Sequence, residues 1–153
     1  MSKTDFYGYQ RPVGKIEDVP ALRDAYIAVF DLKSKRDAAR FGLKYGRHIL
    51  DITGFSPDAE ILLAFEAIRR WIDGKTNYHE ARNIDIYKYA RKESDPIKAQ
   101  YYKTMAQLAC IPHVKFHALW ATDFAITLIN RLYPDDIAEV EKERRFQIML
   151  LDS

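Results

Sequence analysis

The sequence has only one cysteine and few helix-breaking residues, with six glycines and six prolines among 153 residues. A single cysteine excludes an internal disulfide, so nothing in the chain requires an oxidising compartment. No apolar run approaches the roughly 20 residues of a membrane-spanning helix. The opening stretch, MSKTDFYGYQRPVGKIED, also has no apolar core of the kind found in signal peptides. We therefore expect a cytoplasmic protein that does not enter a membrane.

Sequence motifs of catalysis and cofactor binding are also missing. The chain has no glycine-rich phosphate loop, no serine elbow and no Glu-x-x-His pairs of the di-iron type. Its net charge of +2 is too small to favour one class of partner. The sequence therefore predicts no catalytic residues, no cofactor and a non-enzymatic protein.

Apolar residues with helical spacing are present from about residue 20 to the end. Ile61, Phe65, Ile68 and Ile72, for example, are spaced four, three and four apart. Cap-then-proline signals interrupt the pattern, as in Ser94-Asp95-Pro96, and no strand pattern appears. We predict an all-α, single-domain bundle of six to seven mostly antiparallel helices over residues 19–153. Residues 1–18 form an N-terminal arm that is either flexible or docked on the bundle.

The segment from about 112 to 133 is apolar on most of its circumference. A stripe of small residues runs beside a second stripe of bulky ones, among them Phe116, Trp120 and Phe124. A helix apolar on most sides is a buried one. We predict that this helix lies at the centre of the bundle, with Asp123 bonded to a neighbouring helix end or to an arginine such as Arg82 or Arg131.

His113 and His117 raise the question of a metal site, because histidines four residues apart share one face of a helix. Zinc sites need at least a third protein ligand, and Val114 occupies the position of the glutamate in the zinc protease motif. Structural roles are therefore favoured for both histidines. A metal-dependent helical enzyme built on this pair is the alternative, and Cys110 is interpreted as a small buried residue.

A basic cluster extends from Lys33 to His48 and contains six lysines and arginines against the lone Asp37. It is interpreted as the solvated face of an amphipathic helix. Such a face could also bind an acidic protein surface or the phosphates of a nucleic acid. A second candidate patch is the region around Tyr87. The candidate binding residues are Lys33, Lys35, Arg36, Arg40, Lys44, Arg47, Tyr87, Tyr89 and Arg91.

Three stretches, FEAIRRWIDGKTNYHEARN, MAQLACIPHVKFHALWATDFAITLINR and EKERRFQIMLL, together resemble a bacterial family of immunity proteins from toxin–immunity systems. The resemblance covers roughly residues 38 to 151. Its features are a Trp-x-x-Gly helix end, a downstream Ala-Arg, a His-Val-x-x-His-Ala segment and a final helix with Glu-Arg and Gln. The pattern positions, to which we assign structural roles, are Trp71, Gly74, Ala81, Arg82, His113, Val114, His117, Ala118, Asp123, Glu143, Arg144 and Gln147.

The resemblance implies a small all-helical cytoplasmic protein that neutralises a cognate protein toxin, and it supplies no catalytic residues. An inhibitor of this kind needs a stable scaffold and a complementary exposed patch, with no chemistry of its own. A homo-oligomer is also compatible with the sequence. The leading prediction is a non-enzymatic binding protein of the immunity class, with the metal-dependent enzyme and the nucleic-acid-binding module as alternatives.

Overall fold

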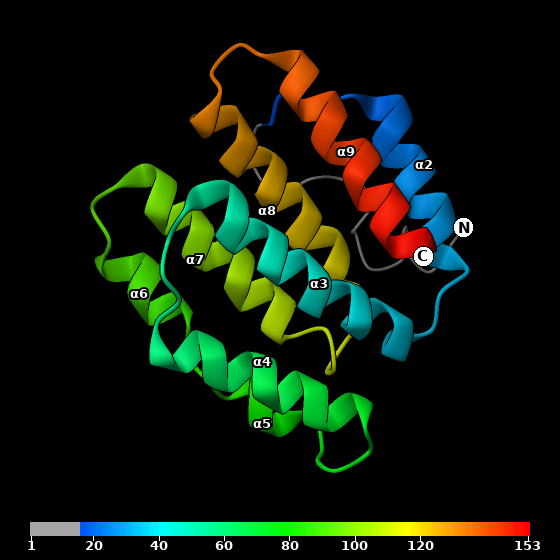
Figure 1. Ribbon diagram of the computed structural model, residues 1–153, viewed down its shortest axis with the longest axis vertical. Coiled ribbons are helices and arrows are strands. Elements are labelled where there is room, and N and C mark those ends of the chain that lie inside the picture. The colour runs from blue at the N-terminus through cyan, green and yellow to red at the C-terminus, as the bar shows by residue number, and fades with distance from the viewer. Residues whose placement is uncertain (1–15) are drawn as a thin grey trace.

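The computed structural model describes residues 16–153, and every regular element in that range is a helix (Figure 1). Six helices are at least 12 residues long, whereas α5 and α6 are short. The helices are α2 (Pro20–Asp31), α3 (Lys35–Thr53), α4 (Ala59–Ile72), α5 (His79–Arg82), α6 (Tyr87–Lys92), α7 (Pro96–Ala109), α8 (His117–Leu132) and α9 (Ile137–Asp152). The prediction of an all-α bundle is confirmed.

Local sequence signals explain where several helices begin and end. The Ser34 side chain accepts a hydrogen bond from the backbone N–H of Asp37, whose carboxylate accepts one from the Ser34 N–H, so α3 opens on a capping box. The same helix ends at Gly54, whose φ of 71° is easily reached only by glycine. Asp95 caps α7 by accepting from the Ile97 N–H, and Pro96 occupies the first turn.

The centre of the bundle is the helix pair α7 and α8 (Figure 1). As predicted, the small-residue stripe of α8 is fully enclosed: Ala118, Ala121 and Ala125 expose none of their surface. Helix α7 shares this central position. Helices α2 and α9 pack together beside α8, α4 packs on α3, α5 on α4, and α6 on α7. Helix α3 contacts helices on both sides of it: it packs on α4 and α7, and also on α8 and α9.

The start of one helix differs from the prediction. Residues 110–116 form hydrogen-bonded turns, so α8 begins at His117 and not near residue 112. Ile111 is fully buried and lies against Gly42, where a Cβ would approach its Cδ1 to 2.8 Å. The contact of Ile111 with Gly42 holds residues 110–116 against α3, so these residues form turns and α8 starts only at His117. Between α4 and α7 the chain forms the two short helices α5 and α6.

The predicted N-terminal arm, residues 1–18, lies mostly outside the described residues. Its last residues are packed on the bundle: the side chain of Asn130 exchanges two hydrogen bonds with the backbone of Glu17, at 2.9 and 3.0 Å. In the part of the chain that the structure describes, no helix combines the length and the apolar character that crossing a bilayer requires.

Candidate functional site

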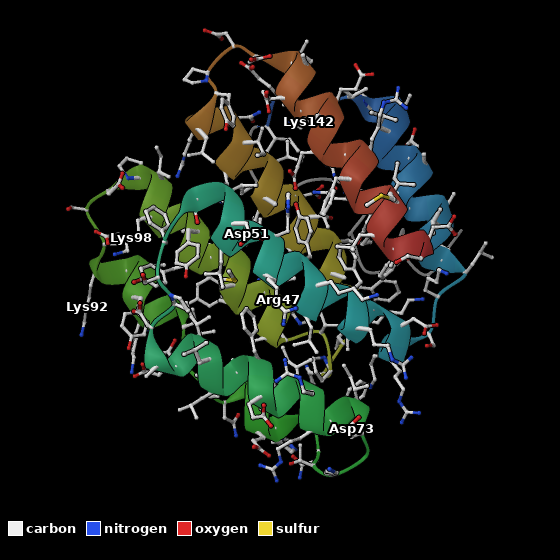
Figure 2. All side chains as sticks on the ribbon, viewed as in Figure 1. Arg47, Asp51, Asp73, Lys92, Lys98 and Lys142 are labelled. Carbon is white, nitrogen blue, oxygen red and sulfur yellow. The ribbon has the colours of Figure 1, made fainter. Side chains whose placement is uncertain are left out.

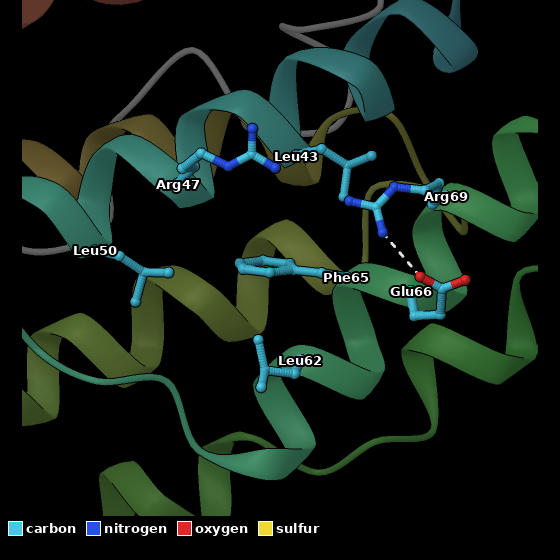
Figure 3. A pocket seen from close by; sticks show the side chains of 7 residues that line it. All are labelled: Leu43, Arg47, Leu50, Leu62, Phe65, Glu66 and Arg69. Atoms are coloured by element: carbon cyan, nitrogen blue, oxygen red, sulfur yellow. Dashed lines mark hydrogen bonds and ion pairs between the residues drawn. The ribbon is translucent and has the colours of Figure 1, made fainter.

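An open groove runs between α3 and α4, at the basic face of α3. It has a volume of about 340 Å³. A smaller hollow of about 220 Å³ adjoins it and shares Leu43, Arg47 and Arg69 with it. The groove is lined by Leu43, Arg47, Leu50, Leu62, Phe65, Glu66 and Arg69 (Figure 3), and the hollow adds Arg40 and Lys44.

Gly46 determines how closely α4 approaches α3 at this groove. A Cβ built on Gly46 would lie 2.7 Å from Cζ and 2.9 Å from Cε1 of Phe65, both too short for a real contact. The Phe65 ring therefore fills the space that a side chain at position 46 would need. Together with Leu43, Leu50 and Leu62, it forms an apolar floor beside the guanidinium groups of Arg47 and Arg69 (Figure 3).

The charges at the groove are exposed, and their ion pairs within the chain are weak ones. Arg69 Nη1 lies 2.8 Å from Glu66 Oε2, and Arg40 Nη1 lies 3.2 Å from Asp37 Oδ1, both in solvent. Neither Lys44 nor Arg47 forms an ion pair with any described residue. Exposed pairs contribute at most about 1 kcal/mol, so these cations are available to a partner.

The other predicted basic residues lie near the start of α3, outside the groove. Lys35 Nζ lies 5.5 Å from the ring centroid of Trp71, a cation–π contact with the end of α4. The backbone carbonyl of Lys33 accepts a 2.6 Å hydrogen bond from Lys115 Nζ. Arg36 is exposed.

The second predicted patch is occupied by contacts within the fold. Tyr87 accepts a hydrogen bond at its hydroxyl from Gln107 Nε2, and the Tyr89 ring stacks on Tyr102 at 5.2 Å. Arg91 Nη2 lies 2.9 Å from Asp85 Oδ2. Both tyrosines are half-buried, so this region offers less free surface than the groove.

His113 and His117 belong to a cluster of rings between α5 and α8. His113 lies on the turn before α8, with its ring 4.9 Å from Tyr78 and 6.2 Å from His117. His117 Nδ1 donates to Gln107 Oε1 at 2.7 Å, because the amide oxygen can only accept. Burial, with the nearby charge of His113 and Arg82, lowers the pKa of His117 to about 4, so the ring is neutral at pH 7.

The ring cluster can be compared with the alternative prediction of a metal site at His113 and His117. Among the described residues, no group of three or more His, Cys, Asp or Glu side chains is placed to hold a metal ion. Burial also raises the pKa of the Cys110 thiol, which keeps it protonated at neutral pH. Two further pattern residues lie at this end: the Arg82 guanidinium sits 5.8 Å from the Tyr78 ring centroid, and Gly74 ends α4 with a φ of 72°.

The pattern residues Asp123, Arg144 and Gln147 meet in a buried ion cluster between α2, α8 and α9. Asp123 accepts hydrogen bonds from Arg23 Nε and Nη2 at 3.0 and 2.9 Å, and from Arg144 Nη2 at 2.8 Å. The prediction that Asp123 bonds an arginine is right in kind, but the partners are Arg23 and Arg144. Arg82 instead lies over the Tyr78 ring, and Arg131 donates a hydrogen bond to the carbonyl of Pro96.

Arg144 is the centre of this ion cluster, with a side chain that is 0% exposed. It also donates to both carboxylate oxygens of Asp18, at 2.9 and 2.6 Å, and to Gln147 Oε1 at 3.0 Å. Burial alone would lower the pKa of Arg144, but the Asp18 and Asp123 carboxylates raise it overall. The guanidinium therefore stays charged, and each of its three nitrogens donates at least one hydrogen bond.

A chain of hydrogen bonds continues from the ion cluster to the surface of α3. Gln147 Nε2 donates to the Tyr45 hydroxyl at 2.8 Å, and that hydroxyl donates to Glu143 Oε2 at 2.6 Å. His48 Nε2 lies 2.9 Å from Glu143 Oε1. Sequence reasoning missed Asp18, Arg23, Tyr45 and His48, because their partners lie about 100 residues away and local spacing carries no signal for such pairs.

The fold and these sites define the class of the protein: an all-helical single domain with a buried ion cluster and an exposed groove of leucines and cations. The chain belongs to the family described as "Imm-5 like putative immunity protein", whose model matches residues 28–153. The resemblance found in the sequence is confirmed at the level of this family. No curated protein and no solved structure matches the chain.

Proposed function

We propose that this chain is the immunity partner of a toxin–immunity pair, a cytoplasmic protein that binds its cognate protein toxin and neutralises it without catalysis. Membership of the immunity family over residues 28–153 is the observation that carries the proposal. It is supported by the groove between α3 and α4, since a binding protein needs an exposed surface whose polar groups are not already committed.

The proposed mechanism is occlusion. A rigid bundle presents a preformed surface, so little conformational entropy is lost when the toxin binds. Cations at the rim would speed the encounter with an acidic surface, and apolar contacts at the centre would slow dissociation. Neither step requires a bond to be made or broken by this chain.

The test uses the protein encoded beside this chain's gene as the toxin. Cells that express this neighbour are expected to grow when the chain is co-expressed and to stop growing without it. Lys142→Glu, on the exposed side of α9 (Figure 2), serves as a matched variant that should protect as well as wild type. Absence of both binding and protection would contradict the proposal.

Titration separates binding from catalysis. Increasing amounts of the chain, added to a fixed amount of toxin, should abolish toxin activity at a fixed molar ratio, because each molecule occludes one site. Complete inactivation far below that ratio would show that the chain turns over its target, and would contradict the non-enzymatic part of the proposal.

A further inference from the structure

We infer that the groove between α3 and α4 binds an acidic amphipathic helix of the partner. This inference rests on the proposed function and deepens it, because it specifies the surface and the chemistry of the segment that the surface receives. Three properties of the groove support it: an exposed apolar floor, a rim on which cations outnumber acids, and a length that matches two helical turns.

The apolar floor is open to water. Leu62, which lines the groove, is 52% exposed, although it lies on a helix whose opposite face is packed in the core; its chain neighbour Leu63, outside the lining, is 59% exposed. Adjacent leucines that remain in solvent beside a hollow are typical of surfaces that bury them against a partner. Phe65, held in place by Gly46, extends this floor across to α3.

The rim determines the charge of the occupant. Four cations, Arg40, Lys44, Arg47 and Arg69, surround the hollow, against the single acid Glu66, which is already paired with Arg69. A partner with carboxylates along both sides of an apolar stripe would satisfy the rim and cover the floor together. A phosphate backbone would use only the cations and leave the leucines in water, so nucleic acid fits less well.

The length of the groove determines how much helix it can hold. On α3 the lining runs from Leu43 to Leu50, and on α4 from Leu62 to Arg69, so each side spans seven residue steps. At 1.5 Å per residue this is about 10 Å, or two turns. A helix with apolar anchors at i, i+3 or i+4, and i+7 presents the same length, which is the helix-in-groove mode of recognition.

The probe is a synthetic peptide of about four helical turns, with leucines at the anchor positions and glutamates beside them. A twin peptide carries lysine at each glutamate. Binding to the full chain is measured by fluorescence anisotropy at low and high salt. The acidic peptide should bind, with an affinity that falls as salt rises, and the basic twin should not.

Matched variants locate the binding surface. Arg47→Glu should weaken binding of the acidic peptide about tenfold, whereas Lys142→Glu, the same charge change on α9, should weaken it less than about twofold. Leu62→Ser should cost about fivefold, while Ile137→Ser, at a position with the same 52% exposure, should have little effect. Circular dichroism confirms that each variant is folded.

The outcomes are distinct from those of the proposed function. If the neighbouring toxin binds wild type and Arg47→Glu equally, the immunity function stands and the groove is wrong. If the acidic peptide binds by these criteria but the toxin does not, the groove stands and the immunity function fails. Equal binding of the two peptides, equal losses in groove and control variants, or tighter binding of a single-stranded oligonucleotide than of the acidic peptide would overturn the inference.

Discussion

The ion cluster around Arg144 and the groove between α3 and α4 are built from the same residue types but differ in what surrounds them. In the ion cluster, the side chains of Arg144 and Asp123 are 0% and 2% exposed. At the groove, Arg69 and Glu66 are 49% and 57% exposed. The buried charges are paired with opposite charges from distant parts of the chain, whereas the exposed ones pair only with neighbours on their own helix or with no described residue.

This contrast suggests a division of roles. Removing one partner from a buried pair leaves an uncompensated charge in a poorly solvated site, so such groups mainly hold the fold. Exposed charges cost little to leave unpaired and little to rearrange, so they can serve recognition. The buried cluster joins α2, α8 and α9, and the groove lies on α3 and α4, so a change in one region should leave the other intact.

The largest expected effect comes from Arg144→Met. The substitution leaves Asp18 without its arginine and Asp123 with Arg23 alone, and should lower the free energy of unfolding by about 3–5 kcal/mol. Urea unfolding measures it. The matched control is Arg145→Met on the same helix, whose side chain is 65% exposed and paired with Glu141; it should cost less than about 0.5 kcal/mol. Similar losses of unfolding free energy for the two variants would contradict the division of roles between buried and exposed charges.

A smaller effect is expected from pH at His117, a buried group that is kept neutral. Its pKa is lowered from 6.5 to about 4, so between these values the unfolded chain binds a proton that the folded chain does not. Stability should therefore be unaffected above pH 6.5 and should fall as pH drops from 6.5 toward 4, by up to about 3 kcal/mol.

The variant His117→Gln isolates this contribution to pH dependence, because the amide can still donate to Gln107 but does not titrate. The difference in unfolding free energy between wild type and variant should change across this pH window. His79→Gln, at an exposed position, is the control for the chemical change from histidine to glutamine. A constant difference between wild type and His117→Gln from pH 4 to 7 would argue against a depressed pKa.

Packing beneath the groove gives a third, smaller effect. Gly46→Ala places a methyl group against the Phe65 ring, and the strain should exceed the gain in helix propensity by about 1 kcal/mol. The double variant with Phe65→Leu should recover most of that loss in thermal unfolding. If Gly46→Ala stabilises the protein, the close approach of α4 to α3 is not a constraint.

The smallest effect on stability is expected at the rim of the groove. Arg47→Glu changes an exposed side chain that pairs with no described residue, so the unfolding free energy should change by less than about 0.5 kcal/mol. Chemical denaturation at moderate salt measures it. A loss above about 2 kcal/mol would mean that Arg47 has a structural role comparable with that of Arg144.

Much of the fold could be predicted from the sequence, because the apolar stripes repeat at helical spacing and caps such as Ser34 and Asp95 mark helix starts. The start of α8 could not, since Pro112 allows either a turn or a helix, and the choice depends on Ile111 docking against Gly42. The central position of α7 was also hidden, because it buries polar residues such as Gln100 and Thr104.

The candidate sites were less predictable than the fold. Periodicity placed Arg40, Lys44 and Arg47 on one face of α3, but not the contribution of α4, which supplies Leu62, Phe65 and Arg69. The partners of Asp123 were missed for the same reason. Both depend on which helices become neighbours, and helix neighbours are set by tertiary packing that local spacing does not encode.

The central claim is that recognition resides on the groove and the fold on the buried cluster. Its most direct test is the dissociation constant of the Arg47→Glu variant for the proposed toxin, compared with that of wild type at the same ionic strength. The account predicts binding weakened by about tenfold. Equal dissociation constants for the two proteins would contradict it.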